Sequence, residues 1–212
     1  MLAKHLQDMH ELLSAFMIIG VIAASINGSL RAIRAKMDMT GAILLSFFAA
    51  NGGGTVRDLL LGTTVFWIND QFYIWLTLSI GVISFLFLSY KRSVLSSRLL
   101  YRFLLVTDAM GLAAFSLAGV EKAISLSQNA TIAIMMGIWT AVGGGILADI
   151  VSNEIPVVLS KEIYITIAFI GSIFYLILCH ITNGILAGMI SATFMILFRL
   201  YSVKFNLSFP SI

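Results

Sequence analysis

Charged residues are scarce in this sequence: Asp, Glu, Lys and Arg make up 11% of its 212 residues, whereas a soluble domain carries about 25%. The mean hydropathy is +1.00, which is typical of an integral membrane protein. Only helices or closed barrels cross a bilayer, because unpaired backbone groups are costly in lipid. The apolar runs are much longer than the roughly ten residues of a barrel strand. We therefore expect an all-α integral membrane protein.

Patterns for catalysis and cofactor binding are also missing. The single cysteine, Cys179, has no partner for an internal disulfide, and His5, His10 and His180 lack the spacing of a zinc site. The glycine-rich stretch GGGTVRD lacks the Gly-Lys-Ser/Thr ending of a phosphate-binding loop. No combination of residues predicts an activated nucleophile. The sequence therefore predicts neither an enzyme nor a cofactor, and the net charge of +3, carried mostly in loops, does not predict nucleic-acid binding.

Long apolar stretches predict how often the chain crosses the membrane. A spanning helix needs about 20 mostly apolar residues. Seven stretches qualify: Leu12–Ile33, Thr40–Leu61, Phe72–Tyr90, Phe103–Ile124, Thr131–Val151, Glu162–Cys179 and Ile181–Tyr201. The connections are short, with a very tight one expected at His180. We expect a single transmembrane unit over residues 1–212, without a soluble domain.

The distribution of basic residues predicts the orientation. Of the 13 Lys and Arg residues, only Lys4, Arg57 and Lys122 fall on the face that carries the N-terminus. Because basic residues favour cytoplasmic loops, we expect a multi-pass inner (plasma) membrane protein with its N-terminus outside and its C-terminus in the cytoplasm. An outer belt of interfacial aromatic side chains is expected at Phe66, Trp67, Phe72, Tyr73 and Trp75.

The chain contains an internal repeat. Shifting the sequence by 91 residues aligns it with itself, without a gap, from Gly20 to Asp58. The aligned pairs include Gly20 with Gly111, Ser25 with Ser116, Gly28 with Gly119, Arg31 with Lys122, the triplet 52–54 with 143–145, and Asp58 with Asp149. We therefore expect repeat one at 12–90, repeat two at 103–179 and a seventh helix at 181–201. Three helices per repeat force the second copy to insert upside down, as in many transporters.

Two glycine triplets lie inside the second and fifth predicted helices: Gly52, Gly53 and Gly54 in the first repeat, and Gly143, Gly144 and Gly145 in the second. Each glycine costs roughly 1 kcal/mol against alanine inside a helix. One interpretation is that both helices break or bend and free carbonyls that bind a monovalent cation beside a water-filled cavity. The other is that the small residues let two helix backbones pack closely.

Acidic and polar residues near this level are candidates for an ion pathway. Asp58 and Asp149 each follow a triplet by one helical turn, and Asp108 is the deepest acid without a counterpart in the other repeat. Intramembrane carboxylates indicate a functional site. The alternatives are headgroup positions for Asp58 and Asp149, and a salt bridge from Asp108 to Arg102 or Arg57. Further candidates are Asn51, Arg57, Ser25, Ser116, Thr140 and Lys122, whose alternatives are interhelical hydrogen bonds or interfacial anchoring.

The doubled GGG-x-x-x-D motif, the 3+3+1 helix count and the orientation resemble prokaryotic members of the trimeric intracellular cation (TRIC) channel family. The related bacterial proteins carry two glycine-transporter domains. The resemblance covers about residues 10–200. It implies a homotrimer whose subunits each conduct potassium or sodium between kinked second and fifth helices. Animal members have a lysine before the first triplet that helps bind an inositol lipid, whereas Ala49, Ala50 and Asn51 stand here.

Two other functions fit the same residues. An inverted repeat also suits a secondary transporter of a small zwitterion such as glycine, because half-helix N-termini can hold a carboxylate and carbonyls an ammonium. A membrane scaffold would use the glycines for packing alone. The predicted partners are two more copies of the chain, membrane lipids, and potassium or sodium ions.

Overall fold

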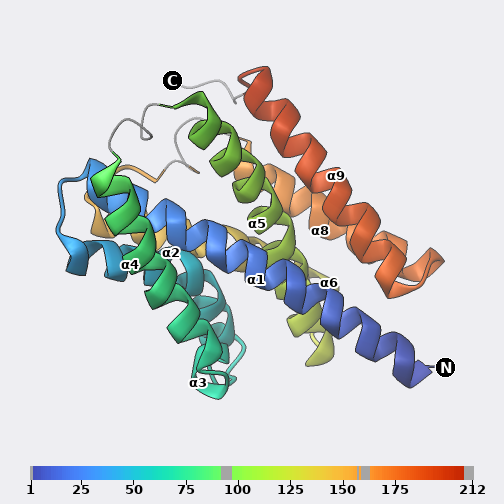
Figure 1. Ribbon diagram of the computed structural model, residues 1–212. Helices are drawn as coiled ribbons and strands as arrows, with labels where there is room; N and C mark the ends of the chain where they lie inside the picture. The colour runs from blue at the N-terminus through green and yellow to red at the C-terminus, as the bar shows by residue number, and fades with distance from the viewer. Residues whose placement is uncertain (1, 92–96, 157, 159–162, 208–212) are drawn as a thin grey trace.

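The computed structural model describes the backbone of residues 2–91, 97–156, 158 and 163–207, with side chains from residue 17 onward. Over these residues the chain is all-helical and contains no strand. Seven of its helices are long and apolar enough to cross a membrane, which confirms the predicted class. They are α1 (Leu2–Arg34), α2 (Met39–Leu60), α4 (Phe72–Tyr90), α5 (Arg98–Ser125), α6 (Ala130–Val151), α8 (Tyr164–Ile181) and α9 (Gly184–Lys204), with the one-turn α3 (Phe66–Asn69) between α2 and α4 (Figure 1).

Side-chain caps set where several helices begin. Asp38 accepts a hydrogen bond from the Gly41 amide at the start of α2, and Asn129 accepts one from the Ile132 amide at the start of α6. Such caps contribute about 1 kcal/mol each. Ser97 caps α5 in the same way, so this helix begins at Arg98 rather than at the predicted Phe103. The prediction followed apolarity, whereas the helix continues into polar sequence once its first amides are bonded.

Three other predicted ends also shift. Helix α1 begins at Leu2 instead of Leu12, because the polar residues before Leu12 contain no helix breaker. The predicted sixth span begins at Glu162, which lies outside the described residues, and α8 continues past the predicted turn at His180 to Ile181. Asn183 then caps α9, which places the tight turn at Thr182 and Asn183, two to three residues later than expected.

Four helices, α1, α2, α5 and α6, make up the centre of the fold. Helix α2 packs on α6, α1 on α2, α5 on α6, and α1 on α5. Helix α4 covers α1 and α2 on one side, while α8 and α9 cover α6 and α5 on the other (Figure 1). Each repeat therefore places its third helix on the outside of its own first two.

The sequence repeat is visible in the packing. A Cβ added to Gly28 would lie 2.5 Å from Cα of Ser46, and one added to Gly119 would lie 2.8 Å from Cα of Gly137. Gly119 and Gly137 are the residues that the 91-residue shift aligns with Gly28 and Ser46. In both repeats the first helix thus touches the second through the same glycine.

The glycine triplets do not break their helices. Helices α2 and α6 are continuous through both triplets, so the expected unwinding and the freed carbonyls are not present. A Cβ added to Gly53 would lie 2.3 Å from the carbonyl oxygen of Thr140, and one added to Gly144 would lie 2.3 Å from that of Ala49. The shift aligns Ala49 with Thr140, so the two contacts are equivalent. The glycines let two unbroken helices pack backbone against backbone, which is the alternative interpretation of the triplets.

Candidate functional site

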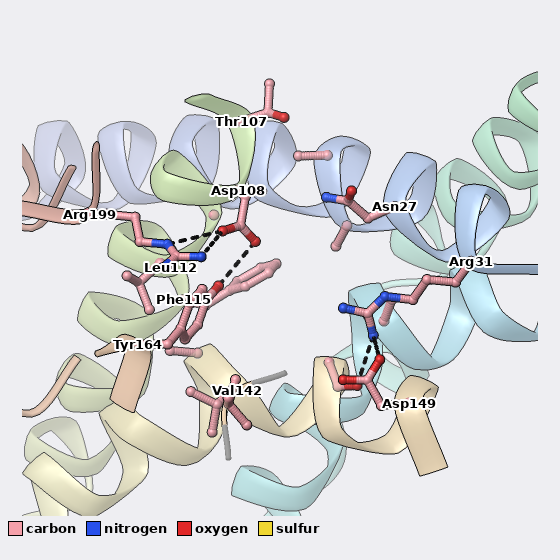
Figure 2. A pocket seen from close by; sticks show the side chains of 18 residues that line it. Asn27, Arg31, Thr107, Asp108, Leu112, Phe115, Val142, Asp149, Tyr164 and Arg199 are labelled. Atoms are coloured by element: carbon pink, nitrogen blue, oxygen red, sulfur yellow. Dashed lines mark hydrogen bonds and ion pairs between the residues drawn. The ribbon is translucent and has the colours of Figure 1, made fainter. Parts of the chain in front are cut away.

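A cavity of about 110 Å³ opens beside the α2–α6 contact. Side chains from α1, α2, α5, α6, α8 and α9 line it, together with Val158. It lies at the face where α1 ends and α8 begins, because Arg31 and Tyr164 both border it (Figure 2). A volume of this size holds several water molecules when polar groups are present to bind them. We call it the inner cavity.

One wall of the inner cavity carries an ion pair between α1 and α6. The guanidinium Nη1 of Arg31 contacts Oδ1 of Asp149 and also donates to the Gly145 carbonyl at 3.0 Å. Asp149 is buried, with 1% of its surface exposed. The carboxylate that follows the second triplet is therefore inside the protein and paired, and does not lie among lipid headgroups.

A second ion pair lies across the inner cavity from the first (Figure 2). Asp108 Oδ2 accepts hydrogen bonds from Nε and Nη2 of Arg199, each at 3.4 Å, and Asp108 Oδ1 accepts one from the Tyr164 hydroxyl at 3.2 Å. The Arg199 guanidinium also lies 4.5 Å from the centroid of the Tyr164 ring. The alternative that Asp108 forms a salt bridge is correct in kind, but its partner is Arg199 of α9, not Arg102 or Arg57.

The inner cavity thus combines two carboxylates with two guanidinium groups in an otherwise mostly small and apolar lining. Burying an unpaired carboxylate would cost several kcal/mol, and each guanidinium offsets part of that cost. A small cation that enters can share a carboxylate with its guanidinium. The site therefore offers anionic oxygens to a cation without holding a large net charge when empty.

Arg57 and Asp58 lie at the other end of the α2–α6 pair and form an ion pair of their own. Nε of Arg57 donates to Oδ1 of Asp58 at 2.8 Å, and both residues are buried. Oδ2 of Asp58 accepts a hydrogen bond from the backbone amide of Phe66 at 2.8 Å. The Arg57 guanidinium lies 5.8 Å from the Phe66 ring centroid. Arg57 therefore points into the protein and does not extend to the interface.

The remaining predicted site residues other than Gly145 do not line the inner cavity. Four of them are buried and hydrogen-bonded: Ser25 to the Val21 carbonyl, Ser116 to the Ser172 hydroxyl, Thr140 to the Met136 carbonyl, and Asn51 to the Thr77 hydroxyl. The bonds of Ser116 and Asn51 join helices, as the alternative interpretation predicts. Lys122 is half-buried near the end of α5. Of the glycines in the two triplets, Gly145 lines the inner cavity.

Sequence reasoning missed three residues of the inner cavity. Arg199 was counted only among the basic residues that set the orientation, Arg31 was counted there and as a repeat position aligned with Lys122, and Tyr164 was not considered. A signal was available for two of them, because the 91-residue shift aligns Arg31 with Lys122 and Tyr73 with Tyr164. No group of three or more His, Cys, Asp or Glu side chains within the described part of the chain is arranged to hold a metal ion.

Comparison with known proteins identifies the family. The model of the family described as "Glycine transporter" matches twice, at residues 14–89 and 105–180. A membrane protein of Vibrio cholerae is 39% identical over 91% of this chain and 79% of its own length. The inner membrane protein YadS of Escherichia coli is 34% identical over 92% of this chain and 93% of its own length.

A solved structure supports the same assignment. It is described as the TRIC trimeric intracellular cation channel orthologue from Rhodobacter sphaeroides, and it is 35% identical to this chain. The two structures superpose with a TM-score of 0.83, covering 92% of this chain and 99% of the other. With both repeats matched and the whole fold shared, the chain is a multi-pass membrane protein that belongs to the TRIC family and to the glycine-transporter family related to it.

Proposed function

We propose that this chain is a cation channel that conducts potassium and sodium through each subunit of a homotrimer. The observation that carries the proposal is the inner cavity, where Asp108 and Asp149 place carboxylates inside the membrane-spanning part of the fold. The Rhodobacter sphaeroides relative, described as a trimeric cation channel, supports both the activity and the assembly. Exposed apolar side chains such as Trp75 and Leu197 suit lipid or a neighbouring subunit.

The pathway that we propose runs alongside the α2–α6 contact, not through unwound helices. Ala49 and Val142 border the inner cavity near the triplets, so the cavity reaches the level at which the two backbones touch. An ion there meets carboxylate oxygens and water instead of a fitted ring of carbonyls. Because such an ion keeps part of its hydration shell, we expect weak discrimination between potassium and sodium.

The inner cavity faces the cytoplasm in this proposal. The arginines at the end of α1 and near the end of α9 lie on the face that is richer in basic residues, which favours a cytoplasmic position. The N-terminus is then outside, and the membrane is the inner membrane, as the name of the Escherichia coli relative supports.

Planar-bilayer recording of the purified protein tests the channel. We expect ohmic single-channel currents in symmetric potassium chloride that reverse with the cation gradient. Asp108→Asn and Asp149→Asn should each lower the conductance by about half or more, since each removes one of the two carboxylates that line the inner cavity. Asp38→Asn is the matched control: Asp38 is an exposed carboxylate on the same face, and asparagine caps a helix as well as aspartate does.

The same cavity also favours a second function, and experiments on the same purified protein distinguish it from the channel. Guanidinium and carboxylate groups facing one another also suit a zwitterion such as glycine, and the matching family is described as a glycine transporter. Silence in the bilayer, together with saturable uptake of glycine into proteoliposomes, would replace the channel by a transporter. Unchanged conductance in both aspartate variants would remove the inner cavity from the pathway.

A further inference from the structure

The repeat places a counterpart of the inner cavity in the opposite half of the molecule. The 91-residue shift aligns residues that line the inner cavity with residues near the far end of the α2–α6 pair. These pairs are Val142 with Asn51, Gly145 with Gly54, Asp149 with Asp58, and Tyr164 with Tyr73. Because the repeats are inverted, the second set belongs to the opposite face. We call the space among Asn51, Gly54, Asp58 and Tyr73 the outer half.

In the outer half, the phenyl ring of Phe66 occupies the position that corresponds to open space in the inner cavity. A Cβ added to Gly54 would lie 2.6 Å from Cε1 of Phe66, whereas one added to Gly145 would meet nothing within 4 Å. The Phe66 ring also lies edge-on to Tyr73, with centroids 5.2 Å apart. The two aligned glycines therefore have different surroundings. Gly145 faces the inner cavity, whereas Gly54 faces the Phe66 ring, which fills the equivalent space.

Phe66 is carried by a short element with few attachments. Helix α3 has four residues and follows Gly62, whose φ of +66° marks a sharp turn. Among the described residues, two hydrogen bonds tie it to α2: the Phe66 amide donates to Asp58 at 2.8 Å, and the Trp67 indole donates to the Thr55 hydroxyl at 2.8 Å. Aromatic contacts of Trp67 with Phe47 of α2 and of Phe66 with Tyr73 of α4 complete its attachment, so this one-turn element can move without breaking the backbone hydrogen bonds of the long helices.

Two residues of the first repeat, Arg57 and Asn51, have no counterpart in the second repeat, and both support a closed outer half. Arg57 is aligned with Ala148, and its guanidinium neutralises Asp58 while lying over the Phe66 ring. Asn51, aligned with Val142, is fully buried, and its Oδ1 has no hydrogen-bond partner among the described residues. Water or a cation admitted to the outer half would supply that partner, as buried polar oxygens generally require.

We propose that Phe66 is a plug that closes the outer half of the ion pathway, and that movement of α3 away from Gly54 opens it. Asp58 and Arg57 hold the plug in place. Asn51 becomes a ligand for water or a monovalent cation once the ring has left. The inference rests on the proposed channel activity, so it is tested with one measurement of current and one of access to water.

Single-channel recording provides the first test. Phe66→Ala removes the ring, and Gly54→Ala pushes it away, because the added methyl would take its place. Both should raise the open probability several-fold. Phe72→Ala is the control, since Phe72 is a neighbouring aromatic residue that also lies edge-on to Tyr73 but is 49% exposed. An open probability unchanged in both Phe66→Ala and Gly54→Ala would overturn the plug.

Cysteine labelling provides a test that needs no current. Asn51→Cys is made with Cys179→Ala, which removes the native thiol, and a membrane-impermeant thiol reagent is applied from each side in turn. Labelling should be slow with Phe66 in place and at least tenfold faster after Phe66→Ala or Gly54→Ala. Phe72→Ala should leave the labelling rate unchanged, because the side-chain atoms nearest to Gly54 belong to Phe66 and the Phe72 ring is 49% exposed.

The two measurements separate the plug from the channel. Faster labelling in a protein that never conducts would keep Phe66 as a barrier to water and refute the proposed channel. Currents with no change in labelling rate would keep the channel and refute the plug. If Phe66→Ala fails to fold, Gly54→Ala with Phe66 intact decides the matter alone.

Discussion

Replacing either of two neighbouring glycines in α6 by alanine should change the stability of the protein in different directions. At Gly144 the added methyl would lie 2.3 Å from the Ala49 carbonyl oxygen, more than 1 Å inside the 3.4–4 Å of ordinary van der Waals contact. The neighbouring atom is backbone of α2, so relief requires the two helices to separate. Overpacking of a tight interface costs typically about 1–3 kcal/mol, and we expect the upper end of that range for Gly144→Ala.

At Gly145 the same methyl would meet nothing within 4 Å. Alanine is favoured over glycine inside a helix by up to about 1 kcal/mol, so Gly145→Ala should be neutral or slightly stabilising. Gly53→Ala should behave like Gly144→Ala, because a methyl there would lie 2.3 Å from the Thr140 carbonyl oxygen. The three variants differ by a single methyl group each and need no other control.

Thermal unfolding of the purified protein in detergent checks these values. For a chain of this length, each kcal/mol shifts Tm by roughly 2–4 °C. A loss of roughly 3 kcal/mol therefore predicts a Tm lower by roughly 6–12 °C for Gly144→Ala and Gly53→Ala, with Gly145→Ala at or above the native value. If Gly144→Ala unfolds at the native temperature, α2 and α6 do not touch as described. If Gly145→Ala unfolds as early as Gly144→Ala, the glycines are needed for their flexibility and not for contact.

Two further predictions concern the ion pairs of the inner cavity. Arg31→Gln removes the guanidinium from buried Asp149 and should destabilise the protein by about 3 kcal/mol; adding Asp149→Asn should recover part of the loss in thermal unfolding, and a double variant whose loss equals the sum of the two single losses would show that the pair contributes nothing. Tyr164→Phe removes one hydrogen bond to Asp108 while keeping the ring beside Arg199, and should lower stability by about 1 kcal/mol. A larger loss on Tyr164→Phe than on Arg31→Gln would reverse the order of importance that burial and charge assign to these contacts.

The spans of this fold follow from sequence because lipid requires them. A stretch such as Thr131–Val151 has too few charges to lie anywhere but in a membrane, and α6 occupies it to within one residue. The pairing of α2 with α6 followed from the repeat, because symmetry-related helices meet at the axis that relates them. Helix ends were harder to predict: Ser97 is one of several serines near α5, and hydropathy does not show which one caps the helix.

The candidate site was predictable only where the residue type restricts the possibilities. Asp149 and Asp108 could be predicted as site candidates because carboxylates are rare in such a chain. Both border the inner cavity. Their partners Arg31 and Arg199 lie 118 and 91 residues away, at helix ends where basic residues are ordinary. The glycine triplets left two interpretations open, because the sequence does not state what fills the space above a glycine. At Gly144 that space is occupied by backbone atoms of α2, and at Gly54 by the Phe66 ring. At Gly145 it is part of the inner cavity.

The differences between the repeats are as informative as their similarity. A strictly duplicated, inverted chain would have two equivalent mouths, both open or both closed. Here two substitutions lie near the proposed pathway: Asp108 opposite Met17 gives one half a second carboxylate, and Arg57 opposite Ala148 gives the other half a cation. One half is a charged cavity as a result, while Asp58 in the other binds an arginine and the amide of Phe66. In the mechanism that we propose, two symmetric halves supply the frame of a pathway, and these few departures leave it a single barrier, at one end, that can be controlled separately from the carboxylates of the inner cavity.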